Sequence, residues 1–490
     1  MKQRTFIGLA IAAFVAAFGT YVSIGTRPME TVPPNVPAER GALVDYTGKP
    51  LTGIEFFWQP ALNAETVRGL EDDRAARLID DLARELDIDG ATLRERVGYQ
   101  ADELHLPARL SDARKAAVAA WLQASEWSGM PNLLRFMRKS ARTYVENAVT
   151  APVVGLVDAD GRGVEGMELQ LDPILDTGTP VRLSIEIDTQ RAMTAVLNDM
   201  ARRAGLEEAN AVAIELATGR IAAIVSVPSF DPTDLPNRRG PNLRLKPATD
   251  AFQAGPMLQP FLLEGVLDAA LPQEPALTSA FINGRRNAGE TMVRALGLER
   301  ATQMLERSGL VQPIDVDFPG AIAPLVRRHG TPQELLRDLG NGAGVAPSLL
   351  RYSTSLAAAL LGTEPQPARI ATAISQSRAI AAPMKVDIAA ALPSRAHALR
   401  TSLIERARRA SGDATADFGG LWATYRDRTA NGTGVRRGAV ALFAPAEQPR
   451  YLIAITVRPS SRSLSAKDML ELGTRAIRTV VPPRTIIASS

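Results

Sequence analysis

Hydrophobic and polar positions follow two distinct periods along this chain, and each period predicts one kind of element. Apolar residues recur every three or four positions over Asp72–Leu86, Asp112–Ser125 and Thr189–Ala204. That spacing places them on one face of an α-helix and predicts three amphipathic helices. Asp188 or Thr189 is the expected cap of the third helix, since short polar side chains bond the free N–H groups of a first turn.

The second period, of two residues, predicts β-strands. It covers Val181–Asp188, Ala211–Leu216 and Arg220–Val227, and a turn at Thr218-Gly219 joins the last two into a hairpin. A second hairpin is predicted further on, from the strands Gly438–Pro445 and Arg450–Val457.

Two further stretches are apolar on all sides and predict buried helices. One begins at Pro256 and continues through Leu267, and the other is Leu349–Leu361. Proline suits a first helical position, because its fixed φ is helical and its missing N–H would be unbonded there. We therefore expect Pro256 to start its helix directly after the loop residue Gly255.

The N-terminal segment Phe6–Ile24 is apolar and uncharged, and it is long enough to cross a bilayer as a helix. Lys2 and Arg4 precede it, so the positive-inside rule places the N-terminus in the cytoplasm. We expect a single-pass anchor in the inner membrane. The bulk of the chain would then lie in the periplasm or outside. A signal peptide cleaved near Ala16 is the alternative. The proline-rich residues 27–39 predict an extended stalk.

Composition adds mainly exclusions to this picture. A length of 490 residues suits two or three domains, and a net charge of +3 without a basic tract argues against nucleic-acid binding. The chain has no cysteine, which excludes disulfides and thiolate metal sites. Its three histidines, His105, His329 and His397, are far apart in sequence and favour neither a metal site nor a Ser-His-Asp triad. We expect no metal and no cofactor.

Several motifs occur in a fixed order along the chain. The most specific is Gly219-Arg220-Ile221-Ala222-Ala223-Ile224-Val225-Ser226-Val227-Pro228-Ser229-Phe230-Asp231-Pro232. Others are Arg40–Leu51, Arg142–Tyr144 with Gly155–Glu168, Thr249–Phe261, and Leu339–Pro347 before its apolar helix. Together they resemble class B penicillin-binding proteins, the peptidoglycan D,D-transpeptidases of the division and elongation type. Phe230 stands where the family has Tyr, and Val145 where it has Pro.

The resemblance implies an α/β (α+β) fold in three parts. Residues 1–27 would be a cytoplasmic tip and transmembrane anchor, and residues 28–175 an elongated pedestal of the dimerisation type. Residues 176–490 would be a transpeptidase-like domain with a five-stranded antiparallel sheet flanked by helices. Glu165 and Glu168 lie in the motif that closes the pedestal, and we favour a structural over a catalytic role for them.

The family's first catalytic motif, Ser-x-x-Lys-Pro-Phe, corresponds to Pro256-Met257-Leu258-Gln259-Pro260-Phe261. Pro256 has neither the nucleophilic hydroxyl nor the backbone N–H that the family uses as an oxyanion donor. Gln259 is neutral and cannot replace the lysine as a proton acceptor. The setting of the site is therefore retained and its chemistry is absent.

The other two motifs have also changed. The Ser-x-Asn motif corresponds to Arg285-Arg286-Asn287, in which only the asparagine remains. For Lys-Ser/Thr-Gly we align Trp422-Ala423-Thr424, with residues 432–434 as a rival placement. Glycine-rich residues 340–344 lack the Gly-Lys-Ser/Thr of a nucleotide-binding loop.

These losses predict a catalytically inactive homologue that acts as a membrane-anchored scaffold or regulator in peptidoglycan synthesis or cell division. The resemblance implies an integral-membrane glycan polymerase or divisome proteins as partners. One alternative is a divergent transpeptidase or penicillin-binding enzyme, with Thr278 or Ser279 as the nearest nucleophile. Another is a muropeptide sensor, in which Arg285, Arg286 and Asn287 hold the carboxylate of a peptidoglycan stem peptide.

Overall fold

A computed structural model describes residues 39–98, 102–130, 132–234, 241–374, 378–379, 393–427, 434–460 and 464–481. The segment Phe6–Ile24, expected to be a membrane anchor, and the stalk up to residue 38 lie outside these ranges. Among the described residues, no helix combines the length and the apolar character needed to cross a bilayer. Contacts group the chain from Arg40 onward into one compact unit, so the division near residue 175 stays a prediction.

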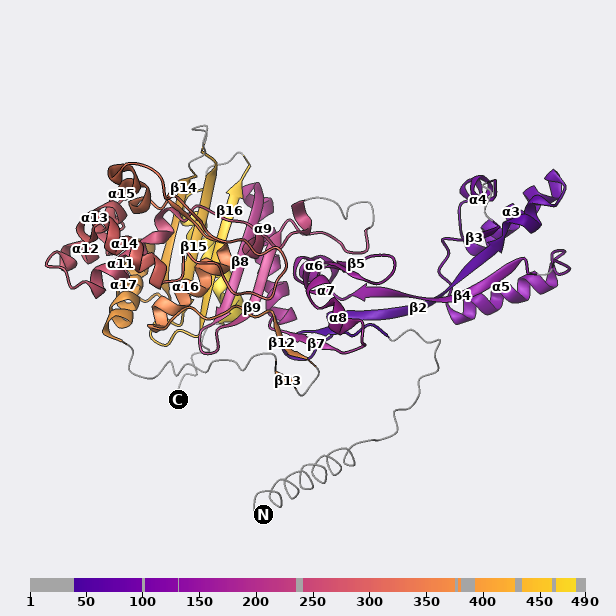
Figure 1. Cartoon of the computed structure of the whole chain (residues 1–490), viewed down its shortest axis with the longest axis horizontal. Helices are drawn as coiled ribbons and strands as arrows, with labels where there is room; N and C mark the ends of the chain where they lie inside the picture. The colour runs from indigo at the N-terminus through magenta and orange to yellow at the C-terminus, as the bar shows by residue number, and fades with distance from the viewer. Residues whose placement is uncertain are drawn as a thin grey trace, which may run out of the picture. The chain divides into compact units, whose positions relative to one another are not determined.

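The first part of this unit is built on a long antiparallel ribbon (Figure 1). Its strands are β2 (Thr52–Asn63) and β4 (Leu134–Tyr144), and β3 (Glu103–His105) pairs with the end of β2. Four helices follow β2 in the chain: α2 (Ala64–Arg68), α3 (Asp72–Leu86), α4 (Gly90–Val97) and α5 (Asp112–Ala124). Their apolar faces bury a small separate core around the fully buried Trp127.

Smaller elements surround the base of this ribbon. Strand β1 (Leu43–Val44) follows Arg40 and pairs in parallel with β7 (Val181–Leu183), and a tight turn at Thr47-Gly48 leads into β2. The other elements are α6 (Asn147–Val154), β5 (Leu156–Val157), β6 (Gly163–Glu165), α7 (Gly166–Gln170) and α8 (Asp172–Leu175).

The second part contains the predicted five-stranded antiparallel sheet, in the order β14-β15-β16-β8-β9. Its strands are β8 (Leu206–Glu215), β9 (Arg220–Val227), β14 (Gly419–Arg426), β15 (Arg436–Ala444) and β16 (Tyr451–Pro459). Helices cover both faces (Figure 1). This explains why the strands are nearly continuous apolar runs, with successive side chains entering different cores.

On one face lie α9 (Ile187–Ala204) and α18 (Ala466–Val480), which pack on side chains such as Val440 and Leu442. On the other face lies the larger core, with α11 (Gln259–Asp268), α16 (Leu349–Leu361) and α17 (Ser394–Ser411). The remaining helices are α10 (Lys246–Thr249), α12 (Glu274–Ile282), α13 (Ala288–Leu296), α14 (Leu298–Arg307) and α15 (Pro332–Gly340), with 3-10 turns at Pro241–Leu243 and Gly255–Leu258. Short strands are β10 (Leu325–Val326), β11 (Val345–Ala346), β12 (Ala371–Ile374) and β13 (Arg378–Ala379).

Two sequence predictions about element boundaries are wrong in detail. The strand predicted over Val181–Asp188 ends at Leu183, and α9 begins at Ile187 with Glu186 as its N-cap residue. Ile187 is buried in the larger core, and the Asp188 side chain pairs with Lys49 and Arg191 rather than capping the helix. Burial of one apolar residue therefore moves the helix start ahead of the expected caps.

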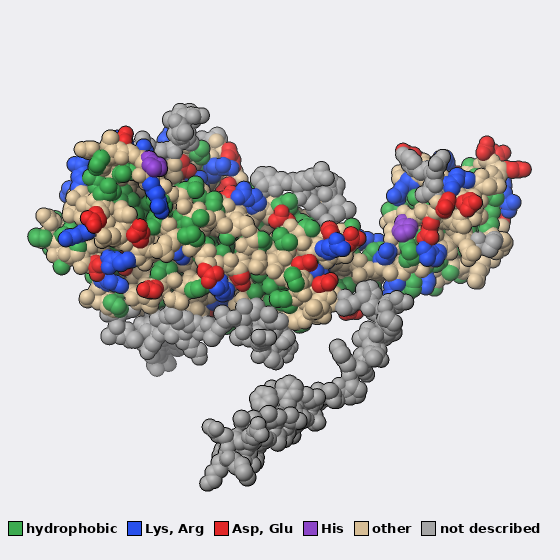
Figure 2. Space-filling model, viewed as in Figure 1, with side chains coloured by type: hydrophobic (Ala, Val, Ile, Leu, Met, Phe, Trp, Pro, Cys, Tyr) green, Lys and Arg blue, Asp and Glu red, His purple; other side chains and the backbone are tan. Residues whose placement is uncertain are grey.

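Acidic and basic side chains are interspersed over the face seen in Figure 2. Exposed large hydrophobic side chains gather instead in one part of the chain. Among the described residues, those in the region 40–175 are Tyr46, Phe56, Val145, Val164 and Leu169, and those outside it are Leu325 and Val435.

Candidate functional site

The predicted first motif lies where the chain enters the buried helix α11. Gly255 has a positive φ of 53° and opens a single 3-10 turn that contains Pro256, and the α-helix itself begins at Gln259. The expectation that the α-helix starts at Pro256 is therefore wrong by one turn. Pro260 has no N–H to donate to the Pro256 carbonyl, so Gln259 N–H bonds that carbonyl in the shorter 3-10 pattern.

Gln259 is enclosed at this position, with only 6% of its surface exposed. Its side-chain Oε1 is buried and accepts no hydrogen bond. A Cβ placed on Gly289 of α13 would lie 3.6 Å from Gln259 Cγ and 2.1 Å from the Gly340 carbonyl oxygen. The first turn of α13, α15 and α11 therefore meet at Gln259, and only a glycine at position 289 permits the approach.

The residues aligned with the second motif stand just before this first turn of α13. Asn287 is its N-cap residue, but its side chain makes no capping hydrogen bond. Arg285, Arg286 and Asn287 are exposed. The structure thus brings the start of α13 to Gln259, while the side chains proposed to hold a ligand carboxylate remain at the surface.

Strand β14, aligned with the third motif, is an edge strand of the sheet. Trp422 packs on the core beneath α9 and α18, which is the face opposite α11. Because side chains alternate along a strand, Leu421 and Tyr425 face the core that contains α11. Of the rival segment 432–434, only Gly434 lies within the described residues.

Tyr425 is a residue of the candidate site that the sequence motifs do not contain. Its hydroxyl donates to the Gln253 carbonyl at 2.7 Å, and its ring lies against Gly255, where a Cβ would come within 2.7 Å of Tyr425 Cε2. Burial raises the pKa of Tyr425, so the phenol stays a neutral donor. Tyr425 lies four positions after the buried Leu421, so the alternation of a strand places both side chains on the same face. This spacing is the sequence signal for Tyr425.

The glycine-rich loop after α15 closes on the same turn from another side. Gly255 N–H donates to the Gly342 carbonyl at 3.1 Å, and a Cβ on Gly342 would lie 2.0 Å from the Gly255 carbonyl oxygen. From α16, the Tyr352 hydroxyl donates to the Met257 carbonyl at 3.1 Å. The turn that carries Pro256 is therefore held by two tyrosines and a backbone contact.

Among the described residues, neither alternative nucleophile hydrogen-bonds a lysine or a histidine, and only Thr278 bonds a carboxylate. Thr278 Oγ1 donates to Glu274 Oε1 at 3.0 Å, and Ser279 Oγ accepts from Asn283 Nδ2 at 3.2 Å, all on or next to α12. The histidines stay apart: His105 is in β3, His397 is in α17, and His329 precedes α15. No group of three or more potential metal ligands occurs among the described residues.

The two glutamates of the pedestal motif lie away from Gln259, in different surroundings. Glu168 is fully buried and receives Arg40 Nε at 2.8 Å and Arg142 Nε at 2.7 Å. Glu165 is partly buried, and this burial raises its pKa although Arg244 opposes the shift. Glu168 therefore joins Arg40 at the start of the described chain to β4 and α7, which is a structural role.

Comparison with known proteins gives the same picture of the fold. No family model matches the chain. It is 22% identical over 354 residues to the peptidoglycan D,D-transpeptidase FtsI of Escherichia coli K12, covering 65% of this chain and 58% of that protein. It is 23% identical over 490 residues to the probable peptidoglycan D,D-transpeptidase PenA of Neisseria gonorrhoeae, covering 86% and 80%. A match to the probable transpeptidase PbpC of Pseudomonas aeruginosa covers 38% of this chain and 42% of that protein at 22% identity.

The chain thus spans less than two thirds of the length of the FtsI and PbpC relatives. Among solved structures, penicillin-binding protein 2X of Streptococcus thermophilus matches with a TM-score of 0.69 at 12% identity, covering 91% of this chain and 79% of that one. Penicillin-binding protein 3 of Mycobacterium tuberculosis, complexed with aztreonam, matches with a TM-score of 0.66 at 18% identity, covering 91% and 97%. The resemblance to class B penicillin-binding proteins is confirmed, and the fold is theirs.

Proposed function

We propose that this penicillin-binding-protein homologue is a non-catalytic, membrane-anchored scaffold or regulator of peptidoglycan synthesis or cell division. The observation that carries the proposal is Pro256 in the 3-10 turn that leads into α11, where the resemblance places the nucleophile. An acyl transfer requires a hydroxyl nucleophile, a base that takes its proton, and N–H donors for the oxyanion. Pro256 supplies neither a hydroxyl nor an N–H, and Gln259 supplies no base.

The packing around Pro256 supports the same proposal. Tyr425 and the Gly342 backbone lie against Gly255, directly before the position where an acyl group would attach. The Gln259 side chain is enclosed rather than open to a substrate. A protein can keep its fold after losing its catalytic activity. Its function then depends on the surfaces that bind other molecules.

Residues 40–175 are the proposed contact for partners. Five of the seven exposed large hydrophobics named above belong to this region, among them Val164 of β6 and Leu169 of α7, each 41% exposed. Exposed apolar side chains are favoured at protein interfaces. We propose that this surface binds an integral-membrane glycan polymerase or divisome proteins. The segment 6–24 would anchor the chain in the inner membrane with its bulk in the periplasm.

The first prediction concerns acylation. After incubation with excess penicillin G, intact-mass spectrometry of the purified chain should show only the unmodified mass, because no hydroxyl occupies the nucleophile position. A penicillin-binding protein with an intact Ser-x-x-Lys motif serves as the positive control and should gain one adduct. A stoichiometric adduct on this chain would overturn the proposal, and peptide mapping would then test Thr278 and Ser279 as the attachment site.

The second prediction concerns the partner surface. The double variant Val164→Glu/Leu169→Glu should co-purify at least about 10-fold less of a co-expressed glycan polymerase of the shape, elongation, division and sporulation type. Two unpaired charges buried at an interface are expected to lower the affinity by more than about 10-fold. Leu325→Glu is the matched control, since Leu325 is 59% exposed but lies outside residues 40–175. Equal recovery with both variants would reject this surface.

A further inference from the structure

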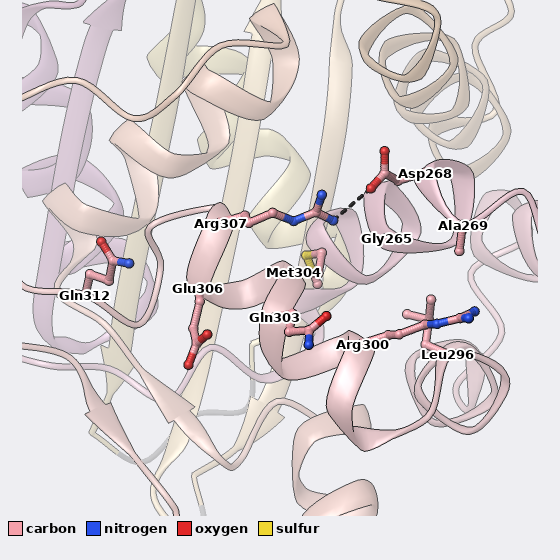
Figure 3. Close-up of a pocket in the computed structure, with 10 residues that line it drawn as sticks. All are labelled: Gly265, Asp268, Ala269, Leu296, Arg300, Gln303, Met304, Glu306, Arg307 and Gln312. Atoms are coloured by element: carbon pink, nitrogen blue, oxygen red, sulfur yellow. Dashed lines mark hydrogen bonds and ion pairs between the residues drawn. The ribbon is translucent and has the colours of Figure 1, made fainter.

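A groove lies on the side of α11 away from its first turn, between α11, α14, α16 and the start of α17. It consists of two hollows of about 620 and about 210 Å³, which share Asp268, Met304 and Arg307. Figure 3 shows the larger hollow, where Arg307 of α14 reaches Asp268 of α11 beside Met304. None of the motif residues discussed above lines either hollow.

The groove holds alternating charges from three helices. Glu264 and Asp268 lie one turn apart on α11, and Arg307 Nη2 pairs with Asp268 at 2.8 Å. From α17, Arg395 Nη1 approaches Asp268 at 3.5 Å and Arg395 Nε approaches Glu264 at 3.9 Å. Arg307 lowers the pKa of Asp268 through its hydrogen bond, whereas burial raises the pKa of Glu264. Asp268 thus accepts hydrogen bonds from both arginines, whereas Glu264 has only the long ion pair with Arg395.

The Glu264 carboxylate has an ion-pair partner but no hydrogen-bond donor among the described residues. Its side chain is only 16% exposed, and the 3.9 Å separation from Arg395 is too long for a hydrogen bond. Within the part of the chain that the structure describes, no donor bonds the Glu264 carboxylate. A buried carboxylate without donors is costly, and the smaller hollow in front of it is where a donor could enter.

Two donors in the same place are also left open. Ser355 of α16 lines the smaller hollow, is fully buried, and its hydroxyl has no hydrogen-bond partner. Its neighbour Ser353 shows the ordinary alternative, since that hydroxyl bonds back to the Leu349 carbonyl at 2.7 Å. Arg395 Nε is likewise buried and without a hydrogen-bond partner. One acceptor and two donors that make no hydrogen bond therefore adjoin one hollow.

We propose that this hollow binds a small zwitterion of the amino-acid type, with its ammonium on Glu264 and its carboxylate on Arg395 Nε and Ser355 Oγ. The two charges of an α-amino acid are separated by a single carbon, which matches an acceptor and a donor that lie 3.9 Å apart and share no hydrogen bond. A simple anion would meet two carboxylates, and a simple cation would leave both donors unpaired. The site is independent of the proposed scaffold function and would couple amino-acid binding to the packing of α11.

The experiment is calorimetric titration of the purified full chain with glycine and both enantiomers of alanine. Methylamine and acetate are the control ligands, because each carries only one of the two charges. Each should bind at least about 10-fold more weakly than glycine, since it lacks one charge-assisted hydrogen bond. Acetate binding as tightly as glycine would overturn the proposal, as would a failure of every zwitterion to bind at concentrations up to its solubility limit.

Two variants separate binding from folding. Glu264→Gln should weaken glycine binding about 10-fold, while the surface control Glu290→Gln leaves it unchanged. Ser355→Ala should also weaken binding, yet keep or raise the thermal midpoint, because it removes a buried hydroxyl without a partner. If Ser355→Ala lowers the midpoint and leaves binding intact, its hydroxyl serves the fold and the assigned site is wrong.

Discussion

Replacement of Glu168 by glutamine is expected to lower the free energy of unfolding by about 3–5 kcal/mol. The carboxylate is fully buried between Arg40 and Arg142, whose side chains are 10% and 3% exposed. Glutamine has nearly the same shape but no charge, so the Arg142 guanidinium would stay buried without its counter-ion, and Arg40 would keep only Asp172, at 2.8 Å. Desolvated charges of this kind are the most costly to leave unpaired.

The measurement is chemical denaturation of the two proteins followed by circular dichroism. Glu290→Gln is the matched control, because Glu290 pairs with Arg294 on the exposed side of α13 at 2.6 Å. An exposed pair spaced by four residues contributes only about 0.3–0.5 kcal/mol. A loss for Glu168→Gln no larger than that of the control would show that the Arg40–Glu168–Arg142 network does not hold this region together.

Gly342→Ala is expected to destabilise the protein by about 2–5 kcal/mol, the sum of two effects. Gly342 has a φ of 73°, which costs an L-residue about 1–2 kcal/mol. The new Cβ would also lie 2.0 Å from the Gly255 carbonyl oxygen, and relief of such overpacking costs about 1–3 kcal/mol. The substitution would push the glycine-rich loop away from the turn that carries Pro256.

Gly412 is the control, because its φ nearly equals that of Gly342 and a Cβ there would contact no other atom. Its φ is 72°, and nothing lies within 4 Å of a Cβ built there. Gly412→Ala should therefore show the conformational cost alone, about 1–2 kcal/mol. The difference between the two variants in denaturation midpoint measures the contact with Gly255. If the two midpoints coincide, the loop does not press on the turn, and the site is more open than its geometry indicates.

The glycine-rich loop illustrates what a motif can and cannot say. From the sequence, a run of glycines before a buried helix allows a phosphate cradle or a close backbone approach. The structure shows the second, because Gly255 N–H and the Gly342 carbonyl are bonded directly. Gly289 has the same function beside Gln259, where any side chain would meet the Gly340 carbonyl.

The sequence by itself determined the elements whose pattern is strong and local. Helices Asp72–Leu86 and Leu349–Leu361 and strand Arg220–Val227 have the predicted bounds, because amphipathic or fully apolar periods fix which side is buried. The sequence also determines that Pro256 carries no hydroxyl and Gln259 no basic group, whereas their place at the nucleophile and base positions stays a prediction.

Only the tertiary structure decided how distant segments complete one another. Helix α9 starts at Ile187, ahead of the expected caps Asp188 and Thr189, because Ile187 is buried in a core that other elements form. The pairing of β14 with β15 determines which side chains of β14 face α11. As a result, Trp422 lies on the opposite face, and Tyr425 contacts Gly255. Glu168 meets Arg40 across 128 positions, and Glu264 meets Arg395 from another helix. Such partners are invisible to local patterns, because their distances are set by packing and not by spacing along the chain.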